Sequence, residues 1–99
     1  MFGAPSRSTI LVFLAEGCPS CEKARPEIDK YKRRNPLQMV LVLDADGPFA
    51  AQFHLAPIRE TPLYVVKIGD RGVKHVGWMK AEAMERWAKI ATATMEEDA

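Results

Sequence analysis

The 99-residue sequence lacks the features that mark several large classes of protein. No apolar run approaches the ~20 residues that a membrane-spanning helix needs, so we expect no membrane partner. Fourteen basic and 13 acidic residues leave a net charge of +1, which gives no broad basic surface for nucleic acid. With only two cysteines, the chain cannot build a framework of several disulfides. The composition therefore predicts one soluble globular domain over residues 1–99.

The N-terminal residues lack the pattern of a secretory signal. Residues 1–8 show no basic stretch followed by a long apolar segment, so they do not resemble a secretory signal. We expect them to form a short N-terminal extension, and residues 95–99 to form an acidic tail. The protein is accordingly expected to be a cytoplasmic monomer. In a reducing compartment, a single pair of cysteines is more often catalytic or metal-binding than a structural staple.

The two cysteines are three residues apart, in the sequence Cys18-Pro19-Ser20-Cys21, directly after the apolar residues 10–14. Two thiols at this spacing can close into a disulfide or open to a dithiol with little backbone movement. A helix that begins at the first cysteine presents unpaired N–H groups and a partial positive charge to its sulfur, which favours the thiolate. Pro19 suits the first helical turn because it lacks an N–H, and the Ser20 hydroxyl is placed to donate to a sulfur. The motif therefore predicts thiol–disulfide chemistry.

Hydrophobic periodicity divides the chain into alternating strands and helices. Continuous apolar runs indicate buried strands, and apolar residues at three- and four-residue spacing indicate helices. The expected elements are buried strands at 10–14 and 39–43, a helix from the cysteines to Asn35-Pro36, a short helix at 48–53, strands at 63–68 and 73–76, and a last helix with the apolar stripe Met84, Trp87, Ala88 and Ala91. The first strand–helix–strand predicts parallel strands in a right-handed unit. The whole order predicts a β-α-β-(α)-β-β-α fold, with a four-stranded mixed sheet flanked by helices.

This order, with Cys-x-x-Cys between the first strand and the first helix, resembles the thioredoxin superfamily. Pro26 stands where thioredoxins carry a proline inside this helix. Thr61-Pro62, just ahead of a strand, is similar to the family's cis-proline segment, whose backbone docks substrate, although Pro57 competes for that role. Gly77 before the last helix also follows the family. The resemblance covers about residues 9–94 and implies a minimal, α/β, thioredoxin-like fold.

The resemblance implies a dithiol–disulfide oxidoreductase whose redox group is the Cys18–Cys21 pair, without a bound cofactor. Cys18 would be the nucleophile and Cys21 the resolving cysteine. Partners would be proteins with disulfides, together with a reductase or low-molecular-weight thiol for recycling. Pro19, Ser20, Thr61, Pro62, Gly77 and Glu16 are the expected supporting residues.

Two departures from the family patterns have consequences. Thioredoxins carry a buried aspartate six residues before the first cysteine, and Val12 stands there. Glu16 is then the nearest carboxylate, so we expect slow resolution of mixed disulfides. Glutaredoxins bind glutathione partly through a glycine-rich turn, and residues 77–80 do not match it. Trp78 in this stretch has two interpretations, as part of a substrate groove or as an aromatic that seals the sheet edge.

The sequence is also compatible with three other functions of the cysteine pair. A purely structural disulfide would close a very small loop, which stabilises a fold less than a long one. A zinc or iron–sulfur carrier would need more ligands, and His54 and His75 are far along the chain, so two chains would have to share their cysteines. A binding module on the same fold would keep its partner after both cysteines were replaced, whereas an enzyme would lose turnover.

Overall fold

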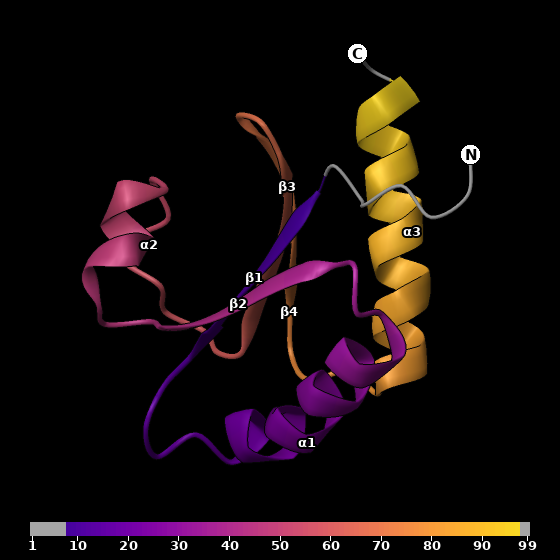
Figure 1. Cartoon of the computed structure of the whole chain (residues 1–99). Helices are drawn as coiled ribbons and strands as arrows, with labels where there is room; N and C mark the ends of the chain where they lie inside the picture. Colours follow the sequence, from indigo (N-terminus) through magenta and orange to yellow (C-terminus); the bar gives the residue numbers. More distant parts are fainter. Residues whose placement is uncertain (1–7, 98–99) are drawn as a thin grey trace.

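A computed structural model describes residues 8–97 of the chain. Its elements follow the order expected from the sequence (Figure 1). They are β1 (Thr9–Leu14), α1 (Pro19–Arg34), β2 (Met39–Asp44), α2 (Pro48–Gln52), β3 (Leu63–Ile68), β4 (Arg71–Val76) and α3 (Ala81–Glu97). The expected extension at residues 1–7 and the last two residues of the expected acidic tail lie outside the described part of the chain.

The four strands form one mixed sheet with the order β2-β1-β3-β4. The central strand β1 is parallel to β2, with Leu11 opposite Leu41, and antiparallel to β3, with Leu11 opposite Val65. Strands β3 and β4 form an antiparallel hairpin. The predicted parallel strand–helix–strand unit and the predicted mixed sheet are therefore confirmed.

Helices cover both faces of the sheet. Alternate residues of β1 point to opposite sides, as they must in an extended strand. Ile10 and Val12 join a core with α1 and α3, while Leu11 and Phe13 join a second core with α2. The larger helices α1 and α3 thus lie on one face and α2 lies on the other (Figure 1).

Helix α1 buries one continuous stripe against the first core. Its fully or nearly fully buried residues are Cys21, Ala24, Ile28 and Tyr31. This is the helical periodicity seen in the sequence. The helix ends at Asn35, whose backbone N–H and side-chain Nδ2 both donate to the Tyr31 carbonyl oxygen at 2.9 Å. The cysteine pair is therefore at the N-terminal end of a helix that packs against the core along its length and is capped at its C-terminal end.

Polar contacts join α1 to α3. Arg34 donates to Glu82 at 3.1 Å and to Glu85 at 2.9 Å, and Lys30 lies 3.2 Å from Glu82. The basic end of α1 is thus partly engaged within the molecule, with Lys30 and Arg34 facing α3.

Helix α3 is longer than the sequence predicted. It continues to Glu97, so the expectation of a tail beginning at residue 95 is wrong for residues 95–97. Met95 is buried one helical turn after the buried Ala91, so the apolar stripe continues up to the residue just before Glu96 and Glu97. No helix in the described residues 8–97 is long and apolar enough to cross a membrane.

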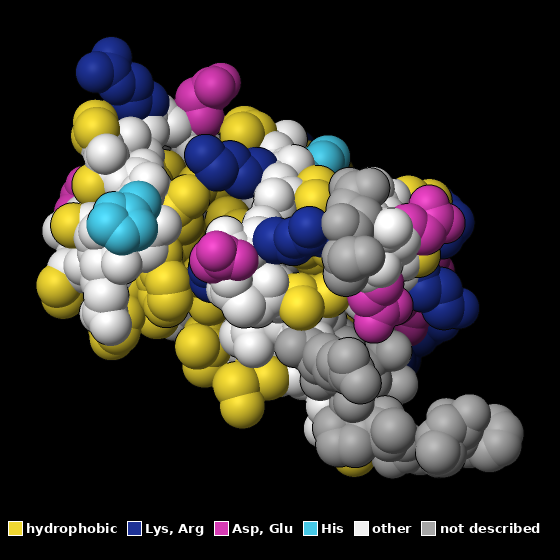
Figure 2. All heavy atoms as spheres, turned by 90° about the horizontal axis from the view of Figure 1, so that it is seen from above, with side chains coloured by type: hydrophobic (Ala, Val, Ile, Leu, Met, Phe, Trp, Pro, Cys, Tyr) yellow, Lys and Arg dark blue, Asp and Glu magenta, His cyan; other side chains and the backbone are white. Residues whose placement is uncertain are grey.

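Strand β2 corrects a second expectation. It was predicted to be buried on both faces, but it lies at the edge of the sheet and its side chains are largely exposed. Met39 is 59% exposed, Leu41 41% and Val42 43%. Seen from above, hydrophobic side chains reach the surface in several places on the half of the molecule that carries α2 (Figure 2). A central strand and an exposed edge strand can have the same apolar sequence pattern. The prediction from this pattern that β2 is buried is therefore wrong.

Candidate active site

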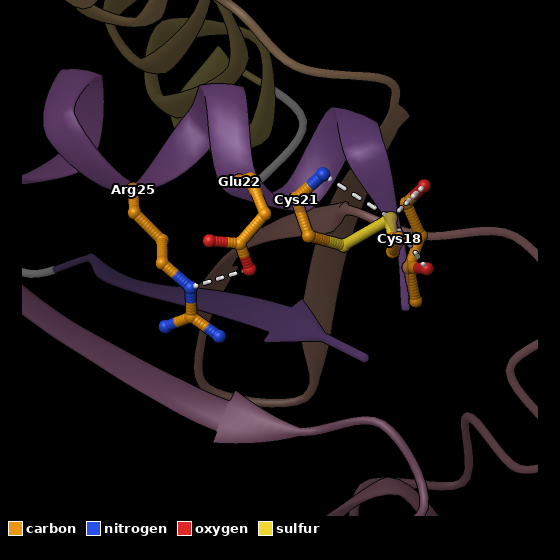
Figure 3. Close-up of a disulfide and its surroundings, with 5 residues drawn as sticks. Cys18, Cys21, Glu22 and Arg25 are labelled. Carbon is orange, nitrogen blue, oxygen red and sulfur yellow. Dashed lines mark hydrogen bonds and ion pairs between the residues drawn. A yellow bond between two sulfur atoms is a disulfide. The ribbon is translucent and has the colours of Figure 1, made fainter. Parts of the chain in front are cut away.

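The cysteine pair lies between the end of β1 and the start of α1. The chain turns there through Gly17, whose φ of +68° is the left-handed conformation that glycine adopts most easily. Cys18 is the N-cap of α1, and it forms a disulfide with Cys21 across a Cα–Cα distance of 5.2 Å (Figure 3). Cys21 is completely buried, whereas Cys18 is partly exposed. Only Cys18 is therefore open to a disulfide of another molecule.

One backbone N–H at the start of α1 points at the first sulfur. The Cys21 N–H donates to Cys18 Sγ at 3.1 Å, and the Glu22 N–H donates to the Cys18 carbonyl oxygen at 3.2 Å. The Cys21 N–H and the positive end of the helix dipole stabilise negative charge on the Cys18 sulfur after reduction. The first-turn carboxylate of Glu22 is turned to Arg25, 3.3 Å away, which offsets its charge next to the sulfur (Figure 3).

Thr61 and Pro62 lie against the exposed side of this pair. The Thr61–Pro62 peptide bond is cis, as is the Ala56–Pro57 bond. Thr61 Oγ1 donates to Cys18 Sγ at 3.4 Å, and the Thr61 carbonyl oxygen is 3.5 Å from the same sulfur. The sulfur carries no hydrogen in the disulfide, so the second distance is a contact that becomes a hydrogen bond only when Cys18 is a thiol. Pro62 is fully buried and directly precedes β3.

Gly77 holds the Thr61–Pro62 segment from the other side. Its N–H donates to the Pro62 carbonyl oxygen at 3.0 Å, and its φ of +103° is in the region that favours glycine. The next residue, Trp78, is 37% exposed, and the Lys23 ammonium of α1 lies 5.8 Å from its ring centroid. An aromatic and a basic side chain therefore lie together where the segment after β4 meets α1.

The structure does not bring every expected residue to the disulfide. Glu16 is exposed and makes no hydrogen bond or ion pair with any described residue. It borders a shallow pocket with Arg25 and Asp44, and neither cysteine lines that pocket. Pro19 is exposed in the first turn of α1. Val12, where thioredoxins carry a buried aspartate, is completely buried in the apolar core.

The two histidines are not near the cysteines. His54 follows α2 with a φ of +61°, and His75 of β4 packs its ring near Tyr64 and Trp87. Within residues 8–97, no group of three or more histidine, cysteine or acidic side chains is placed to hold a metal ion.

Two features of the site were beyond sequence reasoning. The Thr61 hydroxyl contact with Cys18 links residues 43 positions apart, and the resemblance pointed to the segment but not to the side chain. The pairing of Lys23 with Trp78 had no signal in the sequence, because Trp78 could be singled out there but its contact with a residue of α1 could not.

Comparison with known proteins gives a likeness in structure without one in sequence. No family model and no curated protein sequence matches the chain. Among solved structures, thioredoxin-2 of a malaria parasite superposes with a TM-score of 0.70 at 17% identity, over 83% of this chain and 81% of that one. Fasciola hepatica thioredoxin gives 0.68 at 19% identity, over 84% and 80%. A mutant thioredoxin from Halobacterium salinarum gives 0.70 at 19% identity, over 88% and 76%.

These superpositions define the class of the fold. The chain has the thioredoxin fold, in agreement with the resemblance seen in the sequence. It carries a Cys-x-x-Cys disulfide between the first strand and the helix that follows it.

Proposed function

We propose that this protein is a dithiol–disulfide oxidoreductase that acts on disulfides of other proteins. One observation carries the proposal, which is the unequal placement of the two sulfurs. Cys18 is partly exposed at the start of α1, whereas Cys21 is fully buried one turn further on. A structural disulfide has no need of this asymmetry. An exchange catalyst does, because one thiolate must meet the substrate and the other must be held back.

In the first step the reduced Cys18 thiolate attacks one sulfur of a substrate disulfide. A bond forms between Cys18 Sγ and that sulfur, the substrate S–S bond breaks, and the other substrate sulfur leaves as a thiolate that takes up a proton. The Cys21 N–H at the start of α1 and the Thr61 hydroxyl stabilise the attacking thiolate. The cis peptide segment at Thr61–Pro62 lies beside the sulfur, where an extended substrate backbone would dock.

In the second step the Cys21 thiolate attacks Cys18 Sγ and displaces the remaining substrate sulfur. The protein dithiol has then lost two electrons to the substrate, which is released as a dithiol. Cys21 must first lose its proton, and its surroundings are apolar, with Val12 in the same buried core. No carboxylate hydrogen-bonds to Cys21 within residues 8–97. We therefore expect the resolving step to be slow and the mixed disulfide to be long-lived.

The cycle closes when another thiol reduces the Cys18–Cys21 disulfide. A reductase or a low-molecular-weight thiol supplies the two electrons, and no bound organic cofactor is needed. Such reductants are maintained in the cytoplasm, where we expect the protein to act. The exposed segment around Trp78 is where a protein substrate would extend from the disulfide.

Trapping of the intermediate tests this proposal. The Cys21→Ser variant should form a stable covalent adduct with a disulfide-containing protein such as insulin, and mass spectrometry should locate the bond at Cys18. The matched Cys18→Ser variant should give little adduct, because its remaining sulfur is buried. The function would be refuted by a Cys21→Ser protein that forms no adduct at Cys18 while its fold is intact.

A further inference from the structure

The outer edge of β2 is an unpaired and apolar surface. Strand β2 pairs with β1 alone among the described strands, so its other edge presents a row of free backbone N–H and C=O groups. Leu41 lies opposite Leu11 of β1 and Val42 opposite Val12, so these exposed side chains are on opposite faces of the sheet. Leu37, just before the strand, is 58% exposed. Apolar surface therefore borders the free edge on both faces.

The other edge of the same sheet is built differently. Strand β4 has Arg71 and Lys74 among its six residues, and charges of this kind are a usual protection against pairing with another chain. Strand β2 has no lysine, arginine or proline, and its one charged residue is Asp44 at its end. Only the β4 edge therefore carries the usual protection.

We propose that the free edge of β2 pairs antiparallel with the same edge of a second copy of this chain, so that one continuous sheet spans both copies. A two-fold axis at Leu41 would place Val40 opposite Val42 and Met39 opposite Leu43. The pairs within residues 39–43 are then apolar against apolar, and Asp44 faces Gln38. Both copies use the same patch, as a closed symmetric dimer requires.

The charges that flank β2 complement each other in this arrangement. Lys32 and Arg33 are exposed in the last turn of α1, before the strand, and Asp44 and Asp46 are exposed at its end. None of the four forms an ion pair within residues 8–97. Antiparallel pairing brings the basic end of each copy towards the acidic end of the other. Parallel pairing in register would instead place Asp44 against Asp44, so the charges favour the antiparallel dimer.

The dimer leaves the cysteine pair accessible. Thr61 approaches Cys18 from the segment before β3, which lies on the opposite side of β1 from β2. Association through β2 is thus separate from the thiol chemistry, and it is expected to persist in a Cys18→Ser, Cys21→Ser double variant. The earlier expectation of a monomer is replaced by this proposal.

Light scattering and sedimentation across a wide range of protein concentrations test the dimer. The wild-type protein should reach twice the chain mass of 11.1 kDa as concentration rises. Leu41→Lys should raise the dissociation constant more than about tenfold, because two lysines would meet at the axis. Ile90→Lys is the matched control, since Ile90 is 67% exposed on α3, and it should leave the dimer unchanged. Circular dichroism checks that both variants fold.

Cross-linking tests the register separately, in the double-serine background. Leu41→Cys places its thiol on the two-fold axis, where two strands are close enough to form a disulfide. Met39→Cys places its thiol opposite Leu43 of the second copy. The two introduced thiols are then too far apart to form a disulfide. We expect a covalent dimer for Leu41→Cys and a monomer for Met39→Cys under mild oxidation.

The outcomes separate the proposal from its alternatives. A wild-type protein that stays monomeric at all concentrations overturns it, as does a dimer that Leu41→Lys leaves intact. Equal cross-linking by Leu41→Cys and Met39→Cys rejects the antiparallel register. None of these results bears on the proposed oxidoreductase function, because the cross-linking variants have no redox pair and the other variants change residues outside the cysteine site.

Discussion

Thr61 donates its side-chain hydroxyl to the sulfur of Cys18 at 3.4 Å, across 43 residues of sequence. The contact joins the segment before β3 to the start of α1, and it reaches the more exposed of the two sulfurs. A hydroxyl placed there acts on the redox state directly, because a hydrogen bond to sulfur is strongest when the sulfur is a thiolate.

Removal of this hydroxyl should make the protein more reducing. Thr61→Val keeps the shape of the side chain but withdraws a hydrogen bond worth about 1 kcal/mol in the thiolate form. The reduced state loses that stabilisation, so the midpoint potential should fall by roughly 20 mV for the two-electron couple. Alkylation of Cys18 at neutral pH should also slow. Thr61→Ser retains the hydroxyl and serves as the control, and a Thr61→Val protein with the wild-type potential would contradict the assigned role.

Trp78 should matter for protein substrates and not for small ones. Its partly exposed ring adjoins Gly77, which is bonded to Pro62 beside the active site. Trp78→Ala should lower kcat/KM for a protein disulfide by roughly 5- to 30-fold, the equivalent of about 1–2 kcal/mol of lost contact. The rate with a small aromatic disulfide should be unchanged. If Trp78 only seals the sheet edge, the variant will instead lose stability and act equally on both substrates.

A hydrogen bond to the Glu27 side chain links the start of α3 to α1. Glu27 Oε1 accepts a hydrogen bond of 2.9 Å from the N–H of Ala81, which is completely buried. Glu27→Ala leaves that N–H without its acceptor and should lower the free energy of unfolding by about 1 kcal/mol. Glu27→Gln keeps an oxygen at the same place and should cost less. Urea denaturation measures both, and an Ala variant as stable as the wild type would show that the contact has no stabilising role.

The stability of the protein should decline in strongly alkaline solution. Burial raises the pKa of Tyr31 above its usual 10.0, and the nearby charge of Glu85 raises it further. Burial likewise raises the pKa of Tyr64. A raised pKa means that the folded state holds the proton more tightly, so this contribution is complete below pH 10.0 and is lost as the pH rises through the folded-state value.

Tyr31→Phe isolates this effect. The variant has no proton to lose at this position, so its free energy of unfolding should fall less steeply above about pH 10 than that of the wild type. Other groups that titrate in this range contribute equally to both proteins and cancel in the comparison. Identical slopes for the two proteins would exclude Tyr31 as a contributor.

The sequence predicted those parts of the fold that depend on local pattern. The stripe of Cys21, Ala24, Ile28 and Tyr31 is buried in α1, because helical spacing alone decides which face is apolar. The resemblance to thioredoxins added the Thr61–Pro62 segment, which composition and periodicity would not have selected. Together they were sufficient to propose Cys18 and Cys21 as the redox pair.

Features that depend on distant pairing were not predictable in this way. The exposure of Leu41 follows from the position of β2 in the strand order, and an apolar run carries no information on that position. The acidic residues Glu96 and Glu97 suggested a tail, but Met95 is buried and the helix continues to Glu97. The first feature depends on the strand order and the second on the packing of α3 against the sheet, and neither can be predicted from local pattern.

The redox equilibrium of the Cys18–Cys21 pair is the most direct test of the oxidoreductase function. The protein would be equilibrated in glutathione buffers of graded potential, and its thiols counted by alkylation and mass spectrometry. We predict a single two-electron transition with a midpoint between about −120 and −270 mV, the range of thioredoxin-type catalysts. A midpoint below about −300 mV would indicate a structural bond instead. The absence of any intramolecular disulfide would contradict the account altogether.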